Sequence, residues 1–498
     1  MALQQKIKFT GETKMIKKIS TVFLAVVLAL CVLSFTACKK TENERCVYEI
    51  EAEYDQTTQT LDAQMDFTFV NDTDTEISQL KFNLFGNAFR KDAKFRPVSS
   101  GHTASAYYSG LNYGEMNIKS VEGQVLEWQI CGQDENILSV TLSKGVFPNE
   151  KCELEIEYSL LLAKINHRTG VTKRAVNLGN FYPQLCAYDN GFYECEYYSA
   201  GDPFYSECAD YNVTLSLDSD FVVASSGVLK DKRAKGDDTQ YKYELISARD
   251  FCFVFSKDFQ VISEKIDGVE INYYYYADSY ANDSFETGKK CIEYFSDTFG
   301  AYPYKNYSIV QTGFCYGGME YPALSMISDS LSKINNEYTI AHETAHQWWY
   351  SAVGNNQIEN AWQDEGLTEY STVMFFESHP EYKLTREKLV KSAYDSYKSY
   401  YGVYTQLFKE VDTTMNRKLC DFQGEYEYTN IAYNKGVILF DNLRQSIGDN
   451  RFKNGLKRYY NEYRYKIAKP ENLISSFQKS GVDLVGFFSS YINGKAVI

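Results

Sequence analysis

Two histidines and a glutamate lie at a spacing that suits a single metal ion. His342 and His346 are four residues apart, so on a helix both imidazoles project from the same face. Glu343 lies between them, and Glu365 follows His346 after a spacer of 18 residues. Two such histidines and one distant carboxylate form a catalytic zinc site that leaves a fourth position open for water. The sequence therefore predicts one Zn²⁺ held by His342, His346 and Glu365, with Glu343 as the general base.

A chance occurrence is the alternative, because the motif is short and a buried histidine is often an ordinary core residue. With five histidines in 498 residues, a chance His-Glu-x-x-His is expected in roughly one such chain in a few hundred. The distant glutamate lowers this frequency about tenfold further. Three of the four tryptophans, Trp348, Trp349 and Trp362, also lie within 20 residues of His342. The catalytic interpretation is therefore favoured over chance.

Residues on both sides of this motif could complete a peptide-cleaving site. Gly317, Gly318 and Met319 precede Glu320 in a strand-like stretch, and paired glycines let a substrate backbone approach closely, as in strand addition. Glu320 then offers a carboxylate beside the reacting centre. Downstream, Tyr433 begins a helical segment and precedes an Asn-Lys-Gly sequence. Its phenol is predicted to donate a hydrogen bond to a developing oxyanion.

Other polar residues near the motif leave alternatives open. Glu369 lies four residues beyond Glu365, so it can accept a hydrogen bond from a ligand histidine, or it can be a solvated helix carboxylate. Tyr426 and Tyr428 could take the oxyanion role, but neither lies in the Lys-Gly context of Tyr433. The remaining histidines show no ligand spacing and are predicted to be ordinary loop residues: His102, His167 and His379.

The elements that position these residues change type along the chain. From residue 47 to about 255 apolar and polar residues alternate, as in half-buried antiparallel strands; the first apolar set is Tyr48, Ile50, Ala52 and Tyr54. Residues 46–257 are therefore predicted to form an all-β domain of sandwich or saddle type.

Helical spacing dominates the second part of the chain. A strand is predicted near residues 269–276, and helices are predicted over 284–299, 337–353 and 364–378, the last ended by His379-Pro380. The fold class is therefore α+β and multidomain, with a mainly helical catalytic domain over residues 258–498.

The first 45 residues have the pattern of a secretion leader and a tether. Residues 1–38 contain a predicted start at Met15, two lysines and an apolar run that is short for a membrane span. Ser-Phe-Thr-Ala-Cys38 resembles a bacterial lipobox, although Phe35 stands where leucine is usual. The prediction is a lipoprotein acylated at Cys38, with residues 39–45 as a tether, on the outer side of a bacterial cell membrane. A simply cleaved signal or an uncleaved anchor are the alternatives.

Charge and cysteine usage narrow the classes of partner. The formal net charge of −15 argues against a nucleic-acid partner. The twelve cysteines are widely spaced without a Cys-x-x-Cys pair, which favours buried thiols over a second metal site or a disulfide framework. A pair such as Cys186 and Cys195 could still form a bridge in an oxidising compartment.

Together the motifs resemble the aminopeptidase N family of gluzincin zinc metallopeptidases. The order and spacing of Gly-x-Met-Glu, His-Glu-x-x-His, the glutamate 18 residues on and Tyr-x-Lys-Gly all match that family, and the resemblance covers most of the chain after the leader. It implies a thermolysin-like catalytic domain. Carried over by position, it implies the zinc ligands, base and tyrosine assigned above, and it makes Glu320 the anchor for the substrate's free α-amine.

The chain also departs from this family. Tyr321 stands where the commonest form has asparagine, and the 65 residues after Tyr433 can complete a catalytic domain but not the helical C-terminal domain of longer members. A short form with a more open cleft is therefore expected. The residue of the β domain that helps to hold the α-amine is not evident; Gln184 is one candidate, with a structural loop role as the alternative.

The predicted function is a zinc-dependent aminopeptidase that hydrolyses N-terminal residues from peptides outside the cell. Its partners would be peptides with a free N-terminus and, through the lipid anchor, a membrane. One alternative is a thermolysin-like endopeptidase. The other is a non-catalytic surface lipoprotein that only binds peptides.

Overall fold

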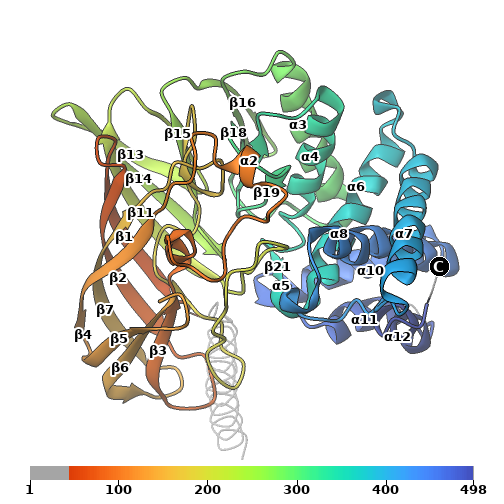
Figure 1. Cartoon of the computed structure of the whole chain (residues 1–498), viewed down its shortest axis with the longest axis horizontal. Coiled ribbons are helices and arrows are strands. Elements are labelled where there is room, and N and C mark those ends of the chain that lie inside the picture. Colours follow the sequence, from red (N-terminus) through yellow and green to blue (C-terminus); the bar gives the residue numbers. More distant parts are fainter. Residues whose placement is uncertain (1–43, 480, 497–498) are drawn as a thin grey trace, which may run out of the picture. The chain divides into compact units, whose positions relative to one another are not determined.

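The computed structural model of the chain describes residues 44–479 and 481–496. The predicted leader, Cys38 and all but the last two residues of the predicted tether lie outside these residues. Strands occupy the first part of the described chain and helices dominate the second (Figure 1). Within the described ranges, no helix combines the length and the apolar character needed to cross a membrane.

A seven-stranded sheet forms the largest part of the β region. Its first two strands along the chain, β1 (Val47–Asp55) and β2 (Thr60–Val70), pair as an antiparallel hairpin, and buried and exposed residues alternate along both, as the sequence predicted for half-buried strands. In the order of the sheet the strands are β13 (Val228–Lys235), β14 (Asp238–Ala248), β11 (Ala209–Asp218), β1, β2, β7 (Lys151–Leu161) and β4 (Glu115–Gly123). The alternation follows from the strand period of two, which turns one face to the core.

Two four-stranded sheets complete the β region. One has the order β10 (Gln184–Leu185), β3 (Ile77–Asn83), β6 (Ile137–Val146) and β5 (Val125–Cys131). The other has the order β12 (Val222–Ser225), β15 (Phe253–Ser256), β9 (Val176–Leu178) and β8 (Thr169–Val171). The short helices η1 (Phe85–Phe89) and α2 (Thr103–Ala106) lie in the connection between β3 and β4.

A five-stranded mixed sheet carries the glycine-rich segment. Its order is β16 (Gln260–Ile266), β17 (Val269–Tyr275), β18 (Asn306–Thr312), β20 (Leu324–Ser328) and β19 (Gly318–Met319). Helix α3 (Ala281–Phe299) connects the parallel strands β17 and β18, and α4 (Lys333–Ala345) follows β20. The two-residue strand β19 is therefore an edge strand, antiparallel to β20.

The remaining chain is mainly helical. It comprises the short pair β21 (Val353–Gly354) and β22 (Lys466–Ile467) and the helices α5 (Gln357–Ala361), η2 (Trp362–Gly366), α6 (Leu367–Ser378), η3 (Pro380–Tyr382), α7 (Arg386–Phe408), η4 (Leu419–Asp421), α8 (Glu425–Tyr428), η5 (Thr429–Asn434), α9 (Lys435–Ile447), α10 (Asp449–Tyr463), α11 (Pro470–Gln478) and α12 (Val485–Ile492). Of these, η2 and η5 are π-helices.

The helix that carries the metal motif is shorter than predicted at its C-terminal end. Helix α4 ends at Ala345, with His346 as its C-cap, whereas the sequence predicted a helix to residue 353. The chain turns here because Ser351 N–H donates to the His346 carbonyl (3.0 Å) and Val353 N–H donates to that of Trp348 (3.0 Å). The loop buries Trp348 and Trp349 completely, so tertiary packing overrides the helical pattern.

The ten cysteines in the described residues are all free thiols. Cys186 and Cys195 are both buried but unbridged, so the disulfide considered from the sequence does not form here. They contribute to the interior as small apolar groups.

Candidate active site

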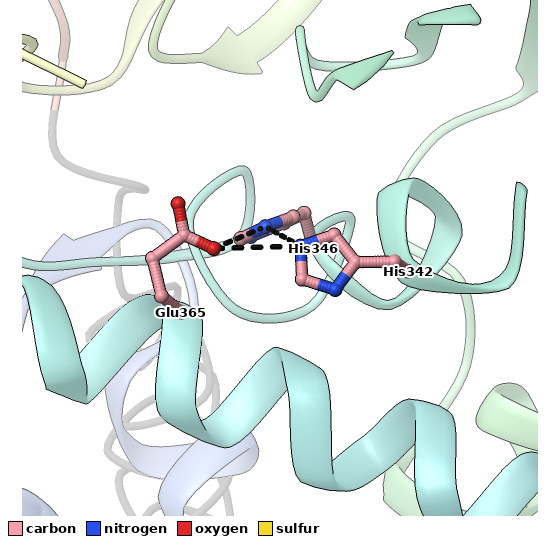
Figure 2. Close-up of side chains that lie close together, drawn as sticks. All are labelled: His342, His346 and Glu365. Carbon is pink, nitrogen blue, oxygen red and sulfur yellow. Dashed lines mark hydrogen bonds and ion pairs between the residues drawn. The ribbon is translucent and has the colours of Figure 1, made fainter. Parts of the chain in front are cut away.

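The three predicted metal ligands meet at one point. His342 lies on α4, His346 at its C-cap and Glu365 on η2, and all three are buried. The two Nε2 atoms lie 3.1 Å apart, and Glu365 Oε2 lies 3.4 Å from His342 Nε2 and 3.3 Å from His346 Nε2 (Figure 2). Three possible ligand atoms therefore point toward one another from two helices.

This arrangement fits a cation better than it fits hydrogen bonding among the three side chains. Both imidazoles use Nδ1 in contacts with other groups, which leaves the Nε2 lone pairs of the neutral rings facing each other. Glu365 Oε2 is buried and accepts no hydrogen bond. Three converging lone-pair donors of nitrogen and carboxylate type are the ligand set of zinc.

Carboxylates behind the ligands orient both rings. Glu369 Oε2 lies 2.7 Å from His342 Nδ1, the contact that the hypothesis for this residue requires, and Tyr338 donates its hydroxyl to the same carboxylate. Asp364 Oδ1 lies 2.8 Å from His346 Nδ1. Such contacts fix the tautomer and increase the basicity of the ligand nitrogen. The sequence did not single out Asp364, although its position next to Glu365 is a signal that could have been used.

Glu343, the predicted general base, is buried at the wall of the active-site cavity. Its carboxylate is buried, and its Oε2 has no hydrogen-bond partner. Burial raises the pKa of Glu343 to about 7, while His342 and His346 act to lower it. A Cβ at Gly318 would lie 2.3 Å from Glu343 Oε1, so only glycine fits beside this carboxylate.

Glu320 follows the edge strand β19 and is buried near the ligands. Gln357 Nε2 lies 3.4 Å from its Oε1. Burial raises the pKa of Glu320 well above its usual value; the His346 imidazole opposes the shift, and Asp202 and Glu343 add to it. Several buried carboxylates thus lie close together, and a positive charge among them would stabilise their ionised forms.

Tyr433 lies against the metal ligands. Its ring stacks on His342 with the centroids 5.9 Å apart and the planes at 12°. Burial, and then the Glu365 carboxylate, hold the pKa of Tyr433 well above its usual value, so the phenol keeps its proton as a donor. Tyr428 also lines the cavity, whereas Tyr426 is 53% exposed and does not.

Two π-helices bring Glu365 and Tyr433 together. Helix η2 carries Glu365 and ends at Gly366, and η5 carries Tyr433 and is followed by α9, whose second residue is Gly436. A Cβ at Gly366 would lie 2.9 Å from Gly436 Cα, and one at Gly436 would lie 2.4 Å from Gly366 Cα. π-Helical turns are rare and occur often at functional sites. The two glycines permit this backbone contact, which no spacing rule predicts.

A cavity of about 540 Å³ opens onto these groups and includes residues of the β region. His342, Glu343, Glu369, Tyr433, Gly317 and Gly318 line it. Arg168 and Asp202 reach it from the loops after β7 and β10 and form an ion pair (Nη1 to Oδ1, 2.7 Å). Burial raises the pKa of Asp202, while Arg168 opposes the shift.

Two of the residues considered from the sequence, Gln184 and His102, bear on the cavity wall. Gln184 does not line the cavity; its Nε2 donates to the Arg249 carbonyl (2.9 Å). His102, predicted to be an ordinary loop residue, does line it, and its Nε2 lies 3.1 Å from Glu425 Oε1. His102, Arg168 and Asp202 were missed because they come from separate loops that only the tertiary fold brings together.

Comparisons with known proteins relate the chain to a family of peptidases. Residues 283–491 match the family model described as the peptidase family M1 domain. Probable aminopeptidase 2 of Sulfurisphaera tokodaii is 23% identical over 298 residues, which cover 54% of this chain and 36% of that protein. Leukotriene A-4 hydrolase of Xenopus laevis is 26% identical over 217 residues, which cover 40% and 34%. The chain thus spans about a third of the length of these curated relatives.

Solved structures share the fold over nearly the whole chain. The M1 zinc metallopeptidase from Deinococcus radiodurans superposes with a TM-score of 0.64 at 14% identity, covering 91% of this chain and 95% of that one. A mutant of the same enzyme bound to a Tyr-Ser-Ala substrate gives a TM-score of 0.62 at 15% identity, with the same coverage. The predicted fold class, a β-rich part followed by a mainly helical part, is therefore confirmed.

Proposed function

Because the chain carries a peptidase family M1 domain, we propose that it is a zinc-dependent aminopeptidase that removes N-terminal residues from peptides. One observation carries the proposal beyond the family: the buried carboxylate of Glu320 lies beside the ligand set, with Asp202 close enough to raise its pKa further. A free N-terminal ammonium would balance the negative charge of these carboxylates, whereas an interior peptide bond carries no charge that could do so.

The metal requirement follows from the ligand geometry. A zinc ion bound by His342, His346 and Glu365 would polarise the scissile carbonyl and acidify a water molecule. These three residues converge on one point, and the second possible ligand group, Glu320, His346 and Asp364, shares His346 with them, so the proposal is one ion per chain. Metal analysis of the purified protein is expected to find about one zinc per chain, and a chelator is expected to abolish activity.

The other residues of the chain carry out the remaining steps. Glu343 takes the proton of the attacking water and delivers it to the leaving nitrogen, for which a pKa of about 7 is suitable. Tyr433 donates its phenolic hydrogen to the oxyanion that forms on the scissile carbonyl. Gly317 and Gly318 leave the edge of the sheet open to an extended substrate backbone.

The decisive experiment compares one peptide with free and N-acetylated termini. The aminopeptidase proposal expects cleavage of the free form only, with the first residue as product. Equal cleavage of both forms would favour the endopeptidase alternative. Glu320→Gln is expected to lower kcat/KM for the free peptide by about 10- to 100-fold, because the charge-assisted contact with the ammonium is lost.

Catalysis itself is tested with Glu343→Gln. Loss of the general base is expected to lower kcat by about 10²- to 10⁴-fold while zinc content stays unchanged. A variant as active as the wild type would refute the assigned role. If the zinc-loaded wild type cleaves none of a panel of aminoacyl amides, the non-catalytic alternative gains support.

The location outside the cell is a separate proposal, supported by the sequence of residues 15–38. Growth of a bacterial expression host with an alkyne-tagged fatty acid would label the wild-type chain but not Cys38→Ser. Labelling of neither chain, with secretion retained, would indicate a simply cleaved signal.

A further inference from the structure

Tyr321, the residue directly after Glu320, reaches out of the catalytic sheet into the β region. Its side chain is completely buried, and its hydroxyl donates to Asn180 Oδ1 at 2.7 Å. Asn180 follows strand β9 and is 141 positions away in the sequence. The contact therefore joins the backbone at Glu320 to a distant part of the chain.

A glycine makes the space for this phenol. A Cβ at Gly179 would lie 1.9 Å from the hydroxyl oxygen of Tyr321, so any other residue would displace the phenol. Gly179 N–H also donates to the Arg168 carbonyl at 2.9 Å, in the segment that supplies Arg168 to the cavity. The phenol and the cavity wall are thus held by the same loop.

The hydrogen bond from Tyr321 continues into a buried carboxylate. Asn180 Nδ2 donates to Asp250 Oδ2 at 2.6 Å, and Asp250 Oδ1 accepts from the Tyr182 hydroxyl at 2.8 Å. Tyr321, Asn180 and Asp250 are each at most 1% exposed. Both carboxyl oxygens of Asp250 accept hydrogen bonds here, so the amide of Asn180 lies with its nitrogen toward Asp250 and its oxygen toward the phenol.

The backbone of the same segment is held from the loop that follows helix α4. Gln347, next to the ligand His346, donates from Nε2 to the Tyr321 carbonyl (3.1 Å) and accepts from Ala323 N–H at Oε1 (2.8 Å). The Glu320 carboxylate, by contrast, has a long contact of 3.4 Å with Gln357. The placement of Glu320 therefore depends on how its neighbour is held.

We propose that Tyr321 is a positioning residue whose phenol, docked on Asn180 and Asp250, holds Glu320 where it meets the N-terminal ammonium of the substrate. This inference rests on the proposed aminopeptidase function. It assigns to the β region a role in substrate recognition that acts through the backbone of Glu320.

Tyr321→Phe tests the inference, because it keeps the ring and removes only the hydroxyl. KM for a free tripeptide is expected to rise about tenfold with kcat within about twofold, since binding of the ammonium is weakened and the reacting groups are untouched. The Kd of leucinamide for the metal-free protein is expected to rise by the same factor, which gives a readout independent of zinc and of turnover. Unchanged KM and Kd, with only a lower Tm, would overturn the inference.

Tyr273→Phe is the matched control. Tyr273 lies on β17 of the same sheet, is equally buried, and donates its hydroxyl to Asp278 Oδ2 at 2.7 Å. The Tyr273→Phe variant loses a comparable buried hydrogen bond that is not connected to Glu320. Its KM and Kd are therefore expected to match those of the wild type. An equal rise in both variants would show a general loss of stability and would also overturn the inference.

Asn180→Gly provides a second route to the same result. The backbone of Asn180 has φ of 51°, which glycine adopts without strain. If Tyr321 and Asn180 act through the same hydrogen bond, Asn180→Gly should raise KM as much as Tyr321→Phe does. The double variant should then raise KM no further. Additive effects would contradict the inference. A wild type that cleaves free and acetylated peptides equally would instead refute the proposed function itself.

Discussion

The Oε2 atom of Glu369 lies 2.7 Å from Nδ1 of His342, so this carboxylate holds the ring with Nε2 facing the other two ligands. Glu369→Gln replaces a charged acceptor by a neutral amide. The Kd for zinc, measured by competition with a chromophoric chelator, is expected to rise about 10- to 100-fold.

The control for Glu369 is Glu377→Gln on the same helix α6. Glu377 pairs with Arg444 Nη1 at 2.6 Å and is not among the residues that line the active-site cavity. Its zinc Kd should equal that of the wild type. Equal Kd values for both variants would show that Glu369 has no role in metal binding.

Tyr433→Phe should separate transition-state stabilisation from substrate binding. The phenol stays protonated because its pKa is held well above its usual value by burial and by Glu365, so it can donate throughout the pH range of activity. Its removal is expected to lower kcat about 10²- to 10³-fold with little change in KM. Steady-state kinetics on an aminoacyl amide measure both, with the exposed Tyr426→Phe as the control. A larger loss in Tyr428→Phe than in Tyr433→Phe would reassign the donor.

Gly366→Ala is expected to destabilise the protein, because its Cβ would lie 2.9 Å from Gly436 Cα. The backbones of η2 and α9 would have to separate, at a cost of about 1–3 kcal/mol or more. Gly402→Ala is the control: it lies in α7 with nothing within 4 Å of an added Cβ, and it should stabilise by about 0.5–1 kcal/mol. Urea denaturation of both variants measures the two effects. Equal stabilities would show that the Gly366 contact can relax.

Asp250 should make stability depend on pH. Burial raises its pKa from 3.8 to about 7, although hydrogen bonds from Tyr182 and the Phe251 N–H act to lower it. A carboxyl with a raised pKa in the folded state contributes stability that is complete below about pH 4 and is lost as the pH rises to about 7. Asp250→Asn does not titrate.

The comparison uses the free energy of unfolding of wild type and Asp250→Asn from about pH 5 to 8. The difference is expected to shift in favour of the variant up to about pH 7 and then to level off. A difference that does not vary with pH would show that Asp250 has an ordinary pKa in the folded chain.

Local patterns in the sequence were sufficient to predict that His342, His346 and Glu365 come together as candidate metal ligands. His342 and His346 are adjacent on one helix face, and Glu365 and Glu369 are adjacent on the next, so the 3.6-residue period already relates them. The strands β1 and β2 were predictable for a similar reason, because the alternation of apolar and polar residues is visible within each short segment.

Features that depend on contacts between distant segments were not predictable. The end of α4 at Ala345 goes with the burial of two tryptophans, and the close approach of η2 and α9 depends on the contact between Gly366 and Gly436. Arg168 and Asp202 enter the cavity from loops with no motif. No periodicity in one sequence encodes such long-range pairs.

Arg249 has a consequence for work with fragments of the chain. Its buried guanidinium donates to the carbonyls of Ser206 (2.7 Å), Tyr350 (2.9 Å) and Lys466. An excised fragment of residues 258–498 would leave the last two carbonyls without this donor, next to the loop that follows His346. Such a fragment loses a buried hydrogen-bond donor from its own interior as well as the neighbouring β region. Expression trials should therefore retain the chain from residue 45 onward.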